Sequence, residues 1–447
     1  MKFSTEAIEK VVSLLSGEMT EWMAAEPELD ALTLENGLRE AMMQIGAASM
    51  ESALAAEEQQ YPVPEVACDC GHHARYTRRR KVKTMSTFGW VRYRRAYYWC
   101  PHCHRGQSPL DRRLGLRPGQ VSVALGSLLA LEGIETSFEN AARRIKELIL
   151  IDVSENTVRA TTQGFGELEE AQEQEWLAEG QDFDNLVERH RTVNDPPERL
   201  YGSVDGVFVL IGSEWSELKV GCWYDVEATG RKCVIPGETD SLHAKDIGYY
   251  CDLSTAERFR DLVWASGYHR DADRAQEIVF VADGAAWIWK LVDDLFPKAV
   301  QIVDWYHAAK YLDDIATAVF CDGEASKQEW LDITRQQLWD GCIDDVIESC
   351  CVWEKRSDAA AALHRAITYY THNKHRMDYA RLRQEGYQIG SGTVESACKQ
   401  IATQRLKRSG ARWGVDGARH TGKARAAYLS GRWSDLKSRS IALAQAA

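Results

Sequence analysis

The stretch Leu200-Tyr201-Gly202-Ser203-Val204-Asp205-Gly206-Val207-Phe208-Val209-Leu210-Ile211 is apolar and rich in β-branched residues, with one carboxylate near its centre. Such a run predicts a strand. A second strand pattern, Ile278-Val279-Phe280-Val281, leads to Asp283 and then to a predicted helix. Glu395, in Gly390-Ser391-Gly392-Thr393-Val394-Glu395, begins a basic helix more than a hundred residues later. The chain therefore places two aspartates on strands and one glutamate on a helix.

These three carboxylates suit one kind of chemistry. Hard divalent cations prefer oxygen ligands, and two such ions a few ångströms apart stabilise both the attacking and the leaving oxygen of a phosphoryl transfer. We therefore expect Asp205, Asp283 and Glu395 to hold two Mg²⁺ or Mn²⁺ ions. Asp-Gly is also a common turn dipeptide, so Asp205-Gly206 or Asp283-Gly284 alone would be weak evidence. The three acidic residues together favour a catalytic site.

Length and composition limit the class of protein. A chain of 447 residues should form several domains, and its hydrophobic fraction of 45% is enough to build their cores. No apolar run of about eighteen residues is present, so no membrane span is expected. The first residues lack the apolar stretch of a signal peptide. We expect a cytoplasmic protein with most of its 12 cysteines reduced.

The charge is unevenly distributed. A net charge of −13 argues against a generally nucleic-acid-binding surface. Basic residues nevertheless concentrate in 75–95 and 399–425, whereas the acidic excess lies in 6–60, 167–198 and 323–358. Local basic patches can still bind phosphates. The alternative for either run alone is a solvated surface.

Two cysteine pairs flank a predicted hairpin. Cys68 and Cys70 precede strand patterns at 81–86 and 90–99, which turn at Phe88-Gly89, and Cys100 and Cys103 follow them. Four thiolates around a hairpin predict a structural Zn²⁺ ribbon with a closed tetrahedral shell. The alternative is four buried or free thiols. Nearby histidines could replace a ligand, because the first pair is Cys-x-Cys: these are His72, His73, His102 and His104.

A helical pair is predicted between 120 and 166. Thr136-Ser137-Phe138-Glu139 is a capping box. After a short break at 150–153, Ser154 caps a second helix rich in polar residues. This pattern suits a helix-turn-helix whose second helix reads base edges through Arg159 and Gln163. An ordinary helical pair is the alternative.

From Arg199 onward the pattern is mixed. Strands are predicted at 200–211, 217–227, 277–282 and 300–304, and helices at 256–266 and 285–295. Residues 308–385 are predicted to be helical throughout. These elements indicate an α/β core that a helical insertion interrupts before Glu395.

Several longer motifs follow one another along the chain. They are Arg94-Arg95-Ala96-Tyr97-Tyr98, Val281-Ala282-Asp283-Gly284-Ala285, Gln301-Ile302-Val303-Asp304-Trp305-Tyr306-His307 and Gly390-Ser391-Gly392-Thr393-Val394-Glu395. With the cysteine pairs, they resemble bacterial insertion-sequence transposases of the ISKra type. The resemblance covers most of residues 65–430 and does not extend to residues 1–60.

The resemblance implies a DDE transposase with an RNase H-like catalytic core. Asp205, Asp283 and Glu395 then match the catalytic triad of carboxylates. Asp304 and His307 match an Asp-x-x-His signature, which lies beside the catalytic centre and is generally not a primary metal ligand. Asp304 ends a predicted core strand, so it is the alternative to Asp283 as second ligand.

The expected fold is multidomain α+β. Its parts are N-terminal helices (1–60), a zinc-ribbon-like module (61–116), a helical and helix-turn-helix region (117–198), the first part of the RNase H-like core (199–312), an all-helical insertion (313–386), and the completion of the core with basic C-terminal helices (387–447). The expected DNA-contacting residues are Arg78, Arg79, Arg80, Lys81, Lys83, Arg159, Gln163, Lys399, Arg405, Lys407, Arg408 and Arg412.

The expected function is binding, metal-dependent cleavage and strand transfer of double-stranded DNA. The partners would be transposon ends and target DNA, with the protein acting as a homodimer or higher oligomer and associating with the nucleoid when bound. Two alternatives share part of this reading. One is a non-catalytic DNA-binding regulator derived from a transposase. The other is a metal-dependent DNA nuclease without strand transfer.

Overall fold

The computed structural model describes residues 13, 16, 17, 30–191, 195–228, 242–320, 325–354 and 360–446. Much of the helical region expected within residues 1–30 lies outside this part. The chain forms two compact units, one of residues 1–168 with 432–447 and one of residues 169–431. Helices and two sheets make up a mixed α/β protein. Within the described residues, no helix combines the length and apolarity needed to cross a membrane.

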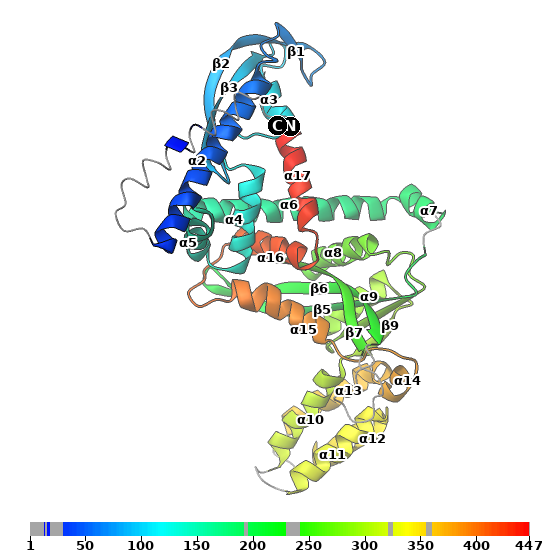
Figure 1. Ribbon diagram of the computed structural model, residues 1–447. Helices are drawn as coiled ribbons and strands as arrows, with labels where there is room; N and C mark the ends of the chain where they lie inside the picture. Colours follow the sequence, from blue (N-terminus) through cyan, green and yellow to red (C-terminus); the bar gives the residue numbers. More distant parts are fainter. Residues whose placement is uncertain are drawn as a thin grey trace. The chain divides into compact units, whose positions relative to one another are not determined.

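The first unit contains a four-stranded antiparallel sheet in the order β1-β2-β3-β4. Its strands are β1 (Glu65–Ala67), β2 (His73–Ser86), β3 (Gly89–Trp99) and β4 (Gly106–Gln107). The long β2–β3 hairpin expected around Phe88-Gly89 is confirmed (Figure 1). Gly89 has a φ of +89°, which L side chains rarely adopt, so glycine suits this turn.

One face of the hairpin is apolar and packs against helices. Val91 and Tyr93 of β3 form a buried cluster with Leu54 of α2 (Ala31–Glu58) and Leu110 of α3 (Pro109–Leu114). Asp30 caps the N-terminus of α2, and its carboxylate accepts a hydrogen bond from Thr33 N at 2.7 Å. The hairpin is therefore fixed on one face and leaves its other face polar.

The remaining helices of the first unit are α4 (Val123–Glu135), α5 (Phe138–Ile149), the first part of α6 (Glu155–Gln181) and α17 (Trp433–Ala446). The expected helical pair is present as α5 and α6, but α6 is much longer than a recognition helix requires. Ile145 and Val158 pack in one core between these helices. Helix α17 also differs from expectation, because the structure groups it with the first unit rather than with the core. Phe165 stacks on Trp433 at 4.8 Å between ring centroids, which explains this grouping.

The second unit contains a five-stranded sheet in the order β7-β6-β5-β8-β9. Its strands are β5 (Arg199–Ile211), β6 (Glu214–Ala228), β7 (Leu242–Asp252), β8 (Glu277–Ala282) and β9 (Val300–Val303). Strands β5, β6 and β7 pair antiparallel, whereas β8 and β9 run parallel to β5. The four expected strands are confirmed, and β7 was not predicted.

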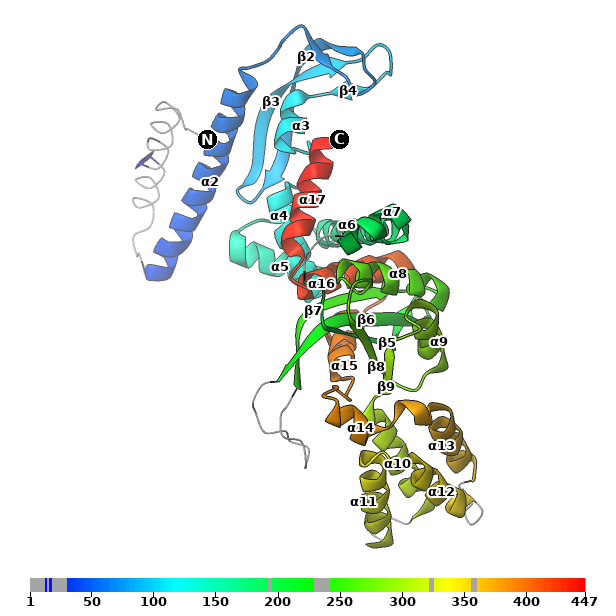
Figure 2. The ribbon, with the colours of Figure 1, turned by 90° about the vertical axis from the view of Figure 1, so that its right-hand side faces the viewer.

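Helices surround this sheet and extend from one end of it. Two of them are α8 (Ala256–His269) and α9 (Ala286–Leu295). The expected helical stretch contains α10 (Trp305–Val319), α11 (Ala325–Trp339), α12 (Ile343–Glu354), α13 (Ala360–Asn373) and α14 (Tyr379–Gln384). Figure 2 shows α10 to α13 gathered at one end of the sheet. The chain then returns through α15 (Gly392–Cys398), the π-helix η2 (Lys399–Leu406) and α16 (Val415–Leu429). A short α7 (Phe183–Arg191) precedes the sheet in sequence.

Candidate functional site

Two aspartates lie on neighbouring parallel strands of the second unit. Asp205 sits on the central strand β5, and Asp283 follows the end of β8, which pairs with β5. Each carboxylate is oriented by a local backbone N–H. Gly206 N donates to Asp205 Oδ1 at 2.7 Å, and Ala285 N donates to Asp283 Oδ1 at 2.9 Å. One oxygen of each carboxylate is thereby fixed.

The electrostatics of Asp205 indicate a site that favours a cation. Burial raises the pKa of Asp205 above its ordinary value, and the negative charge of Asp283 raises it further. The hydrogen bonds from Gly206 and Cys398 and the nearby His307 act in the opposite direction. Two carboxylates close enough to affect each other in this way would be stabilised by a bound positive ion.

Helix α15 brings Glu395 to the same place. The Cys398 thiol, one turn beyond Glu395, lies 3.5 Å from Asp205 Oδ2. Glu395 Oε1 lies 3.7 Å from His307 Nδ1, and its side chain is 51% exposed. Helix α15 thus carries an exposed carboxylate near His307 and, one turn later, a thiol that contacts Asp205.

Asp304 has a different environment from the other acidic residues. It is fully buried and caps α10, where its Oδ1 accepts a hydrogen bond from His307 N at 2.8 Å. Its Oδ2 accepts from Ser391 N at 2.5 Å and also from Ser391 Oγ. Asp304 therefore joins the start of α10 to the segment that carries Glu395. We interpret it as a positioning residue for His307 and Glu395.

Two tyrosines of the helical stretch complete the surroundings of Asp283. Tyr369 of α13 stacks on Tyr311 of α10 with ring centroids 4.1 Å apart. A Cβ atom on Gly284 would lie 2.0 Å from the Tyr369 ring, so this position requires glycine. Burial raises the pKa of both tyrosines, and the charge of Asp283 adds to the shift. Sequence analysis missed these tyrosines because no local pattern marks them.

The donor atoms fit a hard divalent cation. Asp304, His307 and Glu395 each offer a ligand atom within 4.8 Å of the others, and both oxygens of Asp304 already accept hydrogen bonds. Asp205, which interacts electrostatically with His307 and with Asp283, adds a further carboxylate near this group. Oxygen-rich sets of this kind suit Mg²⁺ or Mn²⁺.

The four cysteines of the first unit could hold a zinc ion. Their sulfurs converge, with Sγ–Sγ distances of 3.6 Å between Cys68 and Cys103 and between Cys70 and Cys100. A tetrahedral site with Zn–S bonds of about 2.3 Å requires sulfurs about 3.8 Å apart, so the geometry fits. Backbone hydrogen bonds, chiefly from Cys103, lower the pKa of the Cys100 thiol to about 6. This favours the thiolate that a metal binds at Cys100, whereas burial raises the pKa of the Cys103 thiol to about 12.

Two of the histidines that could have replaced a cysteine ligand, His72 and His102, offer nitrogens within 4.8 Å of the Cys70 sulfur and of each other. His72 and His102 stack face to face with ring centroids 3.6 Å apart. Nitrogen lone pairs lie in the ring plane, so two parallel rings at this separation cannot both point at one ion. The four-cysteine set is the better ligand arrangement.

The basic residues expected on β2 divide into two groups. Arg78, Lys81 and Lys83 are exposed and have no ion pair among the described residues. Arg79 is also exposed, but it donates to the Tyr61 carbonyl at 2.6 Å and lies 3.6 Å from Glu58, and the half-buried Arg80 guanidinium lies 3.4 Å from the centre of the Tyr97 ring. Arg79 and Arg80 therefore make intramolecular contacts in this structure.

The other expected DNA-contacting residues differ in their exposure. Arg159 is exposed on α6, and Gln163 is half-buried one turn later. Four residues of the second basic run are exposed: Lys399, Lys407, Arg408 and Arg412. Arg405 is buried, 4.9 Å from the centre of the Trp413 ring, so it packs inside the unit rather than facing a ligand. The expectation that Arg405 contacts DNA does not fit this placement.

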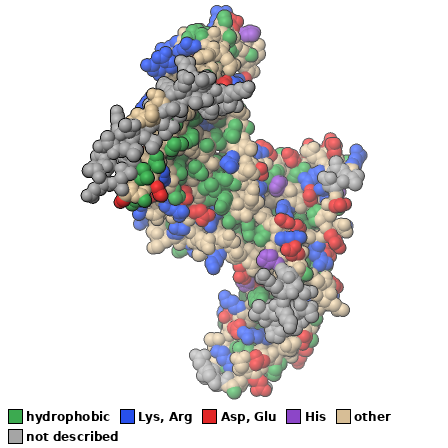
Figure 3. Space-filling model, in the orientation of Figure 1, with side chains coloured by type: hydrophobic (Ala, Val, Ile, Leu, Met, Phe, Trp, Pro, Cys, Tyr) green, Lys and Arg blue, Asp and Glu red, His purple; other side chains and the backbone are tan. Residues whose placement is uncertain are grey.

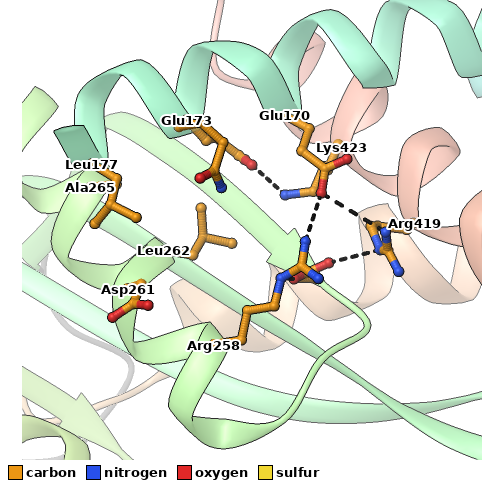
Figure 4. Close-up of a pocket in the computed structure, with 11 residues that line it drawn as sticks. Glu170, Glu173, Leu177, Arg258, Asp261, Leu262, Ala265, Arg419 and Lys423 are labelled. Atoms are coloured by element: carbon orange, nitrogen blue, oxygen red, sulfur yellow. Dashed lines mark hydrogen bonds and ion pairs between the residues drawn. The ribbon is translucent and has the colours of Figure 1, made fainter.

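A separate polar pocket of about 430 Å³ lies between α6, α8 and α16 (Figure 4). Its charges are mostly paired. Lys423 bonds to Glu173, and Arg258 bonds to Glu170 at 3.1 Å. Burial raises the pKa of Glu173 to about 7, whereas Glu173 and Asp252 raise the pKa of Lys423 despite its burial. Because Lys423 faces several acidic groups, we expect it to remain charged and to hold these helices together.

Comparison with known proteins adds no identification. No protein-family model matches the chain, and no curated protein matches it with significant similarity. The case for a function therefore rests on the placement of the side chains.

Proposed function

We propose that the chain is a DDE-type DNA transposase that cleaves transposon-end DNA and joins it to target DNA with the help of divalent metal ions. The observation that carries this proposal is that Asp205 interacts electrostatically with Asp283 and with His307, while His307 lies 3.7 Å from Glu395. The three carboxylates come from two strands and a distant helix. Such a carboxylate set is what phosphoryl transfer with two metal ions requires.

The architecture of the second unit supports the proposal. The resemblance implies an RNase H-like core, and a mixed sheet of three antiparallel strands extended by two parallel ones is compatible with it. The resemblance also implies a helical insertion before the glutamate. Helices α10 to α14 occupy that part of the sequence.

Each side chain has a role that follows from its position. Asp205 and Asp283 would hold Mg²⁺ or Mn²⁺ on the sheet, and Glu395 would complete the site from the exposed side. The bound ions would supply an activated water and neutralise charge on the scissile phosphate. His307 lies beside Glu395 and would orient it, while Asp304 fixes His307 through its backbone N–H. No side-chain nucleophile is needed, because water and then a 3′-hydroxyl attack the phosphate.

DNA recognition would be the task of the first unit. A zinc ion on the four cysteines would stabilise the end of the β2–β3 hairpin, and Arg159 is exposed at the start of α6. We propose double-stranded DNA as the partner and a homodimer or higher oligomer as the active form, since both ends of an element must be handled together.

A strand-cleavage assay tests this function. The protein would be incubated with labelled duplexes carrying a candidate transposon end, a target plasmid, and Mg²⁺ or Mn²⁺. The proposal predicts cleaved ends and joined products, both lost in Asp205→Asn, Asp283→Asn and Glu395→Gln. Cleavage without joining would identify a nuclease. DNA binding without any cleavage, in either metal, would favour a non-catalytic regulator.

A further inference from the structure

The polar face of the β2–β3 hairpin carries like charges directly opposite each other. Lys81 pairs with Arg94 across the two strands, and Lys83 pairs with Arg92. Residues two apart on a strand point to the same side, so all four lie on one face. The intervening Val82 and Tyr93 belong to the apolar cluster on the other face. We call these four residues the basic ladder.

No acidic side chain in the described part of the chain neutralises the basic ladder. All four side chains are exposed, and among the described residues none forms an ion pair. The Lys83 ammonium lies 3.9 Å from the centre of the Trp90 ring and makes a stabilising cation–π contact with it. Like charges directly opposite in an antiparallel pair destabilise the sheet. A bound anionic ligand would therefore stabilise a folded hairpin that contains two such pairs.

Two other arginines in or near the hairpin are paired with acidic side chains. Arg75 of β2 pairs with Glu65 at 3.2 Å, and Arg112 of α3 pairs with Asp69 at 2.8 Å. These arginines are neutralised by nearby acids even though they are solvent-accessible. Among the described residues, the four members of the basic ladder lack the acidic partners that Arg75 and Arg112 have.

The basic ladder forms one wall of a groove of about 850 Å³ beside α2. Five basic side chains and two acidic ones line it. Both acidic side chains are engaged: Glu51 accepts a hydrogen bond from Arg92 N at 2.7 Å, and Glu58 lies 3.6 Å from Arg79. In Figure 3 Lys and Arg side chains gather over the strand β2. The groove is open and carries an excess of positive charge.

We propose that the basic ladder binds the phosphate backbone of double-stranded DNA, through Lys81, Lys83, Arg92 and Arg94. The inference rests on the proposed function and identifies the surface that would bind the DNA backbone. It adds Arg92 and Arg94 to the residues expected from the sequence. It leaves out Arg80, which stacks on Tyr97, and Arg79, which lines the groove but already lies 3.6 Å from Glu58.

The dimensions of the ladder suit a short stretch of backbone. Each cross-strand pair of the ladder forms one rung. The two rungs lie about 6.8 Å apart, because a strand rises about 3.4 Å per residue. Phosphates on one strand of DNA advance about 3.4 Å along the axis per nucleotide, so the ladder spans about two nucleotide steps. A two-stranded ribbon is also narrow enough to lie along a major groove. Contacts of this kind position DNA without reading its sequence.

The test is a salt titration of DNA affinity without added divalent cations, so that binding is measured without cleavage. The ladder variant Lys83→Gln with Arg92→Gln removes one rung. If both cations contact phosphates, the slope of log K against log salt concentration becomes shallower by about 1.8. The loss of affinity should be the same factor for end DNA and for random duplex.

A matched variant removes the same charge from paired positions. Arg75→Gln with Arg112→Gln takes two cations from the same module, and the slope should stay close to that of the unaltered protein. Thermal unfolding provides a second readout that does not depend on DNA. Removing a rung relieves like-charge repulsion, so the ladder variant should unfold at the same temperature as the unaltered protein or at a higher one.

Three results with the variants would overturn the inference. They are an unchanged salt slope in the ladder variant, an equal change in the matched variant, and a loss confined to end DNA. Failure of the unaltered protein to bind duplex DNA would overturn it as well. Cleavage is scored separately, so a protein that binds through the ladder but does not cut would refute the proposed function alone.

Discussion

Replacement of Asp304 by Ala should destabilise the second unit without removing a metal ligand. The buried carboxylate accepts hydrogen bonds from His307 N and from both polar groups of Ser391. Loss of the helix cap costs about 1 kcal/mol, and loss of each charged hydrogen bond costs about 1.5 kcal/mol. The free energy of unfolding should therefore fall by about 4 kcal/mol. Asp304→Asn, which keeps an accepting oxygen, should lose about half as much.

In the metal-free protein, unlike the replacement of Asp304, the replacement of Asp205 should not lower the free energy of unfolding. The folded-state pKa of Asp205 is raised by burial and by Asp283, so the folded state binds a proton more tightly than the unfolded chain does. The stability that Asp205 contributes is fully present below pH 3.8 and is lost as pH rises through the raised pKa. At pH 7 Asp205→Asn should therefore unfold no more easily than the unaltered protein.

Denaturant titration followed by tryptophan fluorescence measures these differences, and repeating it with Mn²⁺ separates the two roles. A bound ion stabilises only the folded state, so Mn²⁺ should raise the unfolding midpoint of the unaltered protein and of Asp304→Asn. It should not raise that of Asp205→Asn. The reasoning fails if Asp304→Asn is as stable as the unaltered protein and has lost the response to Mn²⁺. That result would make Asp304 the second metal ligand.

Three further predictions concern other parts of the molecule. Gly284→Ala forces a Cβ atom against the Tyr369 ring and should lower the free energy of unfolding by about 1–3 kcal/mol. Gly392→Ala is the control and should be neutral, because a Cβ atom there would meet no atom within 4 Å. Thermal unfolding of the two variants compares them. Lys423→Met leaves buried carboxylates uncompensated and should lower the free energy of unfolding by about 3–5 kcal/mol at pH 7. This loss should shrink as the pH falls, because those carboxylates take up protons. In the same denaturant titrations, Lys437→Met at an exposed position should leave the free energy of unfolding unchanged. Cys100→Ser should release zinc and make residues 65–105 protease-sensitive; purified protein that contains no zinc would contradict this prediction.

The main secondary structure of the second unit could be predicted because its strands have strong local patterns. The β-branched run around Asp205 and the buried strand before Asp283 both became strands of one sheet. Strand β7 was missed because its first half carries His243, Lys245 and Asp246 on a partly exposed edge, so its apolar pattern is confined to its second half. Edge strands of this kind are recognised by their pairing with a neighbour, which sequence alone does not display.

The roles of individual side chains depended on contacts that are distant in sequence. The function of Asp304 is set by Ser391, 87 positions later. The contacts of Arg79 with Glu58 and of Arg80 with Tyr97 likewise could not be inferred from a run of basic residues. Charge runs predict which segment is basic. Folding decides which of its side chains remain available to a ligand.

The most direct test of the central claim compares Mn²⁺-dependent cleavage rates of single and double carboxylate variants on a pre-nicked transposon-end duplex. If Asp205, Asp283 and Glu395 act as one metal-binding unit, each single substitution should reduce the rate as severely as the double substitution Asp205→Asn with Glu395→Gln. DNA affinity should be unchanged in all of them. A single variant that retains the unaltered rate, or cleavage that persists without any divalent ion, would contradict the account.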